Sequence, residues 1–132
     1  MAIEKVLKMG NPLLREQAQP FQLEEITSNE TQELVQSMWD TMDEYGGIGL
    51  AAPQIGISKQ LAVIRIDEDN ERYPEAEKSE EIVIFNPQIT VLDETLQGFW
   101  EGCLSVPGLR GVVFRPRKVQ IDFLDQSAKE AS

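Results

Sequence analysis

The chain has 132 residues, 23 of them acidic and 12 basic, which gives a formal net charge of −11. This balance argues against nucleic acid and anionic membranes as direct partners, because both are bound by basic surfaces. With a single cysteine and no apolar run near the ~20 residues of a membrane span, we expect one intracellular domain over residues 1–132, in a bacterial-type cytoplasm.

A helix from about Asn29 to Tyr45 is the first long element that the pattern predicts. Thr27 followed by Glu30 reads as a capping box before it, and Gly46 and Gly47 are typical of a helix end. Apolar side chains recur along it at spacings of three and four, which predicts one buried face. They are Leu34, Val35, Met38, Met42 and Tyr45.

A glycine-rich stretch, residues 46–56, follows this helix. Such glycines indicate close approach by another chain, although a plain connector between helix and strand explains them as well. The stretch is not a phosphate loop, because no Lys-Ser/Thr pair follows the glycines. Gln54 is its one polar side chain and could donate a hydrogen bond to a substrate oxygen.

Runs of β-branched and apolar residues predict strands in the rest of the chain. They cover residues 61–66, 82–85, 89–92, 112–114 and 119–124. We expect a long loop over 67–81, a strand end at Asn86-Pro87 and a turn at 106–108. The fold class is therefore α+β, with mostly antiparallel strands around one long N-terminal helix. One helix does not cover five strands, so an apolar sheet face should lie open.

Cys103 is the only cysteine and lies between two strand-like segments, in a stretch that contains Gly98 and Gly102. A free cysteine is commonly a small buried hydrophobe. The alternative is a thiolate that binds a metal or attacks a substrate. The chain contains no histidine, so any such chemistry lacks the commonest metal ligand and the usual general base.

Three stretches resemble the peptide deformylase family. Residues 47–54 resemble its signature G-x-G-[LIM]-A-A-x-Q, and residues 101–105 match E-G-C-L-S. Residues 6–7 and 11–15 are similar to the N-terminus of the family in type and spacing. The resemblance covers nearly the whole chain. It implies the deformylase fold and a metallohydrolase that removes the formyl group from the N-terminal methionine of nascent polypeptides.

The resemblance also implies catalytic roles for three matching residues. Cys103 matches the thiolate ligand of one divalent metal, Fe²⁺ or in its place Zn²⁺, Ni²⁺ or Co²⁺. Gln54 and the backbone N–H of Leu104 match the donors that stabilise the tetrahedral oxyanion.

Substrate-binding roles are implied in the same way for five further positions. Gly49 and Arg110 match residues that hold the peptide backbone. Ile48 and Phe99 match the lining of the methionine pocket, with Glu101 at its edge. The implied partners are N-formyl-methionyl peptides, including nascent chains at the ribosome.

The third family signature, H-E-x-x-H, is absent. It supplies two metal-binding histidines and the catalytic glutamate, on a helix beyond E-G-C-L-S. We therefore expect a C-terminal truncation and not a substitution. Because Cys103 alone does not hold a divalent metal tightly in an open tetrahedral site, we expect these 132 residues alone to bind no metal and to be inactive.

Three interpretations remain open, and with them the question whether this chain is an enzyme. In the first, the chain is the larger part of a deformylase. In the second, it is a natural short relative that serves as a non-catalytic peptide-binding or assembly module. In the third, Cys103 is a nucleophile with a carboxylate as base, although the motif supplies no base at its own spacing. An uncovered apolar sheet face would favour a dimer, a swapped form or aggregation.

Overall fold

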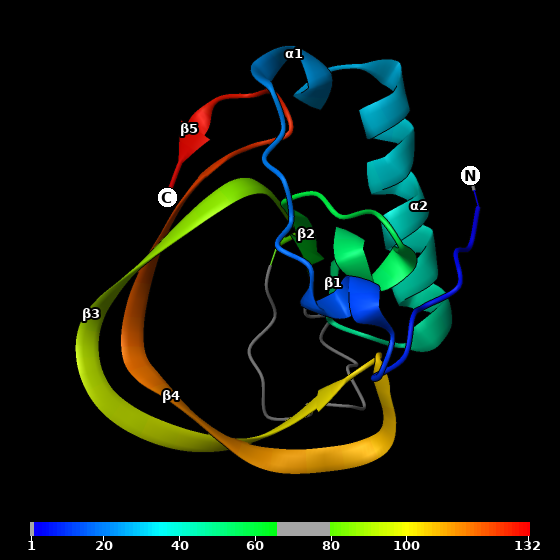
Figure 1. The fold of residues 1–132 in the computed structure, drawn as a ribbon. Helices are drawn as coiled ribbons and strands as arrows, with labels where there is room; N and C mark the ends of the chain where they lie inside the picture. The colour runs from blue at the N-terminus through cyan, green and yellow to red at the C-terminus, as the bar shows by residue number, and fades with distance from the viewer. Residues whose placement is uncertain (1, 66–79) are drawn as a thin grey trace.

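The computed structural model describes residues 2–65 and 80–132 (Figure 1). Within these ranges, five strands form one antiparallel sheet in chain order, and one helix is long. The predicted α+β class is confirmed. The elements are η1 (Pro12–Arg15), α1 (Leu23–Ile26), α2 (Asn29–Tyr45), β1 (Gly49–Ala51), η2 (Ala52–Ile55), β2 (Leu61–Ile64), β3 (Ile82–Cys103), β4 (Val106–Leu124) and β5 (Glu130–Ala131).

Helix α2 has the predicted bounds, but its cap differs from the prediction. Ser28 is the N-cap, and its Oγ accepts the backbone N–H of Thr31 at 3.2 Å. The predicted capping box on Thr27 is wrong, because Thr27 is the residue that ends α1. At the other end Gly46 adopts φ 67°, the left-handed conformation in which helices commonly stop.

The buried face of α2 largely follows the predicted stripe. Val35, Met38 and Met42 are at most 1 % exposed, whereas Tyr45 is 46 % exposed and does not belong to it. Thr41 is fully buried as well. Its hydroxyl donates to the Ser37 carbonyl and accepts the Glu4 N–H, so the polar group is satisfied.

The core lies between α2, the N-terminal segment and the β1–β2–β3 part of the sheet. Its strand side chains include Leu50, Leu61, Val63 and Phe85. The Phe85 ring meets Phe21 edge to face, with 5.0 Å between centroids. Aromatic pairs favour this geometry, which joins the N-terminal segment to the sheet.

Strands β3 and β4 are longer than predicted. The segments 82–85 and 89–92 belong to one strand, as do 112–114 and 119–124. Asn86-Pro87 does not end β3 but forms an irregularity in the pairing with β4, where Asn86 has φ 51°. Such a bulge accommodates a proline, which has no N–H to donate to the ladder.

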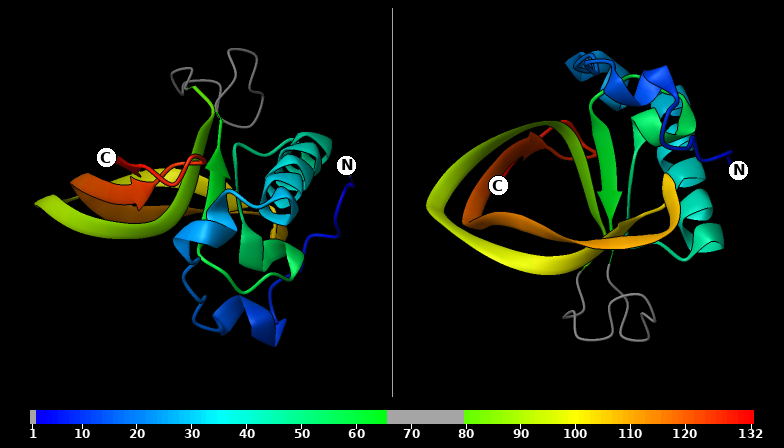
Figure 2. Two further views of the ribbon diagram at one scale, coloured as in Figure 1. Left: turned by 90° about the horizontal axis from the view of Figure 1, so that it is seen from above. Right: turned by 60° about the horizontal axis from the view of Figure 1, so that its bottom comes forward.

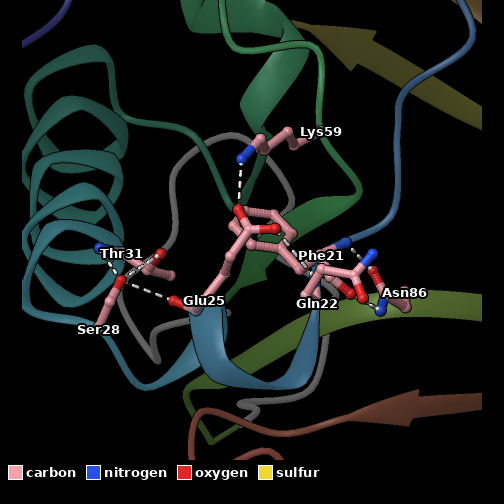
Figure 3. Close-up of polar contacts among 7 residues, drawn as sticks. All are labelled: Phe21, Gln22, Glu25, Ser28, Thr31, Lys59 and Asn86. Carbon is pink, nitrogen blue, oxygen red and sulfur yellow. Dashed lines mark hydrogen bonds and ion pairs between the residues drawn. The ribbon is translucent and has the colours of Figure 1, made fainter.

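Long-range hydrogen bonds hold this bulge in place. The Phe21 N–H donates to Asn86 Oδ1 at 2.8 Å, and Asn86 Nδ2 donates to the Phe21 carbonyl at 2.9 Å (Figure 3). Beside it, Lys59 Nζ lies 2.6 Å from the Glu25 carboxylate. The side chain of Asn86 thus joins β3 to the N-terminal segment, which a local sequence pattern does not reveal.

Other predictions are also corrected. The turn lies at Leu104-Ser105, and residues 106–108 already belong to β4. Residues 49–51, for which no strand was predicted, pair with β2, and the chain end contributes β5. The predicted loop 67–81 lies mostly outside the described residues, as does residue 66. In the described part of the chain, no helix is long and apolar enough to cross a membrane.

The middle of the β3–β4 hairpin arches away from α2, and its turn returns toward that helix (Figure 2). Many apolar side chains of the hairpin are exposed. The expected open sheet face is confirmed. Large side chains of the hairpin that are at least 41 % exposed are Ile89, Val91, Leu92, Leu96, Phe99, Trp100, Leu109, Val112, Phe114 and Val119.

Candidate functional site

The two stretches that resemble family signatures meet where the hairpin turn approaches the start of β1. A Cβ atom at Gly47 would lie 2.8 Å from Leu104 Cδ1, closer than real side chains allow. A residue with a Cβ atom at position 47 would therefore require the Leu104 side chain to shift. Close approach thus concerns Gly47, whereas Gly46 and Gly56 adopt positive φ with open space around them.

Gln54 lies on η2 and reaches the second stretch with its carboxamide. Its Nε2 donates to Ser105 Oγ at 3.0 Å and lies 3.6 Å from Cys103 Sγ. Its Oε1 accepts the Ala51 N–H at 2.9 Å. An amide donor and a thiol thus lie side by side next to the turn residue Leu104.

Cys103 is exposed at the end of β3, so the interpretation as a small buried hydrophobe is wrong. The thiol lies immediately before the turn, where neither strand covers it. An exposed thiol is accessible to a metal or a ligand.

The residues present do not by themselves fit a tightly held metal ion. Among residues 2–65 and 80–132, no group of three His, Cys, Asp or Glu side chains is placed to hold one. Cys103 offers one soft ligand, whereas catalytic zinc sites use three protein ligands. The described residues alone therefore do not complete a catalytic metal site.

The carboxylate nearest to Cys103 in sequence is already paired. Glu101 accepts hydrogen bonds from Arg115 Nε at 2.6 Å and from Arg115 Nη2 at 2.7 Å. The hydrogen bonds and charge of Arg115 lower the pKa of Glu101 below its ordinary value. A lower pKa makes a weaker base, which disfavours Glu101 as the base of a cysteine nucleophile.

The residues implied in substrate binding spread along the neighbouring strands. Gly49 pairs with β2, and the Ile48 carbonyl accepts the backbone N–H of Arg65. Phe99 lies opposite Val113, and Arg110 lies opposite Gly102. Because Phe99 is 58 % exposed, the described residues do not enclose it in a pocket.

The sequence gives no signal for several of these contacts. Arg115 reaches Glu101 only because β3 and β4 pair in this register. The N-terminal segment is the second case: the Leu7 N–H donates to the Gln54 carbonyl at 2.7 Å, and the Met9 N–H donates to the Ser105 carbonyl at 2.8 Å. Strand register and crossing segments join residues far apart in sequence.

Comparison with known proteins gives consistent results. The family model described as "Polypeptide deformylase" matches residues 3–132. A peptide deformylase from Leptospira biflexa is 45 % identical over 130 residues, which are 98 % of this chain and 73 % of that protein. Solved peptide deformylases are also similar. One from Acinetobacter baumannii, bound to Met-Ala-Ser, has TM-score 0.93 and 35 % identity, covering 98 % of this chain and 81 % of that one. One from Legionella pneumophila has TM-score 0.83 and 41 % identity, covering 98 % and 70 %.

Proposed function

Since this chain belongs to the peptide deformylase family, whose members are metal-dependent hydrolases, we propose that it recognises the N-formyl group of N-terminal formyl-methionine. The family reaction is hydrolysis of that group from nascent polypeptides. Residues 1–132 would act as one domain in the cytoplasm, where nascent chains carry the substrate.

The observation that carries the proposal is the placement of the Gln54 carboxamide 3.6 Å from Cys103 Sγ and beside the turn at Leu104. In the proposed mode, Gln54 Nε2 and the Leu104 backbone N–H donate to the formyl oxygen. Such donors stabilise negative charge as a tetrahedral oxyanion forms. Cys103 would supply one metal ligand, and a metal bound in a complete family site would supply Lewis-acid activation of water.

The remaining predicted residues have proposed roles in binding the peptide. Gly49 and Arg110 would hold its backbone. Ile48 and Phe99 would contact the methionine side chain, with Glu101 at the edge, where Arg115 fixes its carboxylate. The Met-Ala-Ser bound to the Acinetobacter enzyme supports a short methionyl peptide as the ligand class.

We further propose that these 132 residues, taken alone, do not hydrolyse formyl peptides. The support is the ligand set: the chain has no histidine, and the described residues offer one thiol. The alternative function, a non-catalytic module that binds such peptides, uses the same donors.

We propose separately that a second copy of this chain covers the exposed apolar face of the β3–β4 hairpin.

The test combines metal content, formate release and peptide binding on the purified 132-residue protein. We expect less than one metal per chain, no formate from N-formyl-Met-Ala-Ser, and binding of that peptide measured by calorimetry. Gln54→Ala should weaken binding, by about tenfold if it removes one strong donor. The matched control is Gln36→Ala, an exposed glutamine on α2.

Each outcome decides between the functions. One metal per chain with formate release would overturn the proposed inactivity and support a hydrolase. Binding without metal or formate would support the peptide-binding module. Absence of both binding and formate release, at intact mass and with a folded spectrum, would overturn the proposed recognition of formyl peptides.

A further inference from the structure

Ser105 is buried although it lies in a hairpin turn. It is 5 % exposed, while Cys103, two residues earlier, is exposed. The N-terminal segment accounts for part of this burial, because the Met9 N–H donates to the Ser105 carbonyl. Two residues earlier, the Leu7 N–H donates to the Gln54 carbonyl. One segment therefore fixes the backbones of both Ser105 and Gln54.

The side chains of these two residues are joined as well. Gln54 Oε1 is committed to the Ala51 N–H at 2.9 Å, which determines which end of the carboxamide carries the nitrogen. One hydrogen of Nε2 then points to Ser105 Oγ at 3.0 Å. The other is left for the side of Cys103, where Sγ lies at 3.6 Å and is only a weak acceptor.

We propose that Ser105 is a positioning residue. Its hydroxyl accepts one N–H of Gln54 and so directs the second N–H toward a carbonyl oxygen bound beside Cys103. The inference rests on the proposed function, because it assigns that second N–H to the formyl oxygen. Ser105 itself does not contact the substrate in this arrangement.

The alternative is that Ser105 only fills space under the turn. If Ser105 only fills space, its loss would lower the stability of the fold and weaken the binding of every peptide to a similar degree. If it positions Gln54, its loss would free the Gln54 carboxamide and weaken the binding only of ligands that carry a formyl oxygen.

The test uses Ser105→Ala, with Ser105→Thr to restore the hydroxyl and Ser127→Ala as an exposed control. Calorimetry compares N-formyl-Met-Ala-Ser with unformylated Met-Ala-Ser, and NMR relaxation reports the order of the Gln54 carboxamide in the free protein. Ser105→Ala should weaken the binding of the formyl peptide about fivefold, the equivalent of one neutral hydrogen bond. The affinity for the unformylated peptide should not change. Ser105→Thr should restore the preference for the formyl group.

The inference would be overturned if the Gln54 carboxamide were equally ordered in Ser105→Ala and in the natural chain. It would also be overturned if Ser105→Ala weakened the binding of both peptides to the same degree. If the natural chain binds no formyl peptide, the proposed function fails, and the relaxation measurement still decides whether Ser105 orders Gln54. Should Ser105→Ala not fold, Ser105→Cys keeps the size with a weak acceptor, and the same two measurements apply to it.

Discussion

At the scale of single residues, the Glu101–Arg115 pair is a site where electrostatics is open to direct test. The Arg115 side chain is 63 % exposed and Glu101 29 %, so solvent screens the pair, but its two short hydrogen bonds fix the carboxylate. We expect Arg115→Gln to raise the pKa of Glu101 toward its ordinary value of 4.5, measured by NMR titration of the side-chain carboxyl.

The sign of the pH dependence follows from the lowered pKa. A carboxylate whose pKa is lower in the folded state stabilises the fold above its unfolded pKa, and this contribution is lost as the pH falls through the folded pKa. The difference in unfolding midpoint between the natural chain and Arg115→Gln should therefore be present at pH 7 and vanish in acid. Arg117→Gln, an exposed change on the same strand, is the control. A difference that is the same at both pH values would contradict the assignment.

At the scale of elements, helix α2 is held by its buried face and not by its surface. Met38 is fully buried in the core cluster, so Met38→Ala should lower the free energy of unfolding by about 2–5 kcal/mol, through lost burial and the cavity left behind. Urea unfolding measures this change. The matched control is Met9→Ala, because Met9 is 69 % exposed and its backbone N–H bond to Ser105 is retained. The control should stay within about 0.5 kcal/mol. Similar losses in both variants would show that the core does not lie where the structure has it.

At the scale of the whole molecule, the exposed hairpin face should make the chain associate with itself. Trp100 is 65 % exposed and pairs across the strands with Val112, and Phe114 is 66 % exposed over Gly98 on the same face. Contiguous exposed apolar surface of this kind marks an interaction site. Light scattering should give a mass that rises with concentration.

Charge placed on that face provides the control. Trp100→Glu with Phe114→Glu should shift the protein toward the monomer, whereas Leu23→Glu, at an apolar position on α1 that is 56 % exposed, should not. A monomer at all concentrations in the natural chain would contradict association through the hairpin.

The sequence by itself determined the features that depend on neighbouring residues. The 3.6-residue period and the glycines at the end predicted α2 between Asn29 and Tyr45, and the structure confirms both bounds. The two signatures predicted the family, which the comparisons confirm. Even the open sheet face followed from counting elements, because one helix does not cover such a sheet.

Only the tertiary structure decided how distant segments pair. Asn86 of β3 hydrogen-bonds through its side chain to Phe21, 65 residues away. The contacts of Gln54 with Ser105, and of Glu101 with Arg115, depend on a turn and a strand register. Local propensity acts over a few residues and carries no information on the partner across a sheet, so these contacts appear only when the chain is folded.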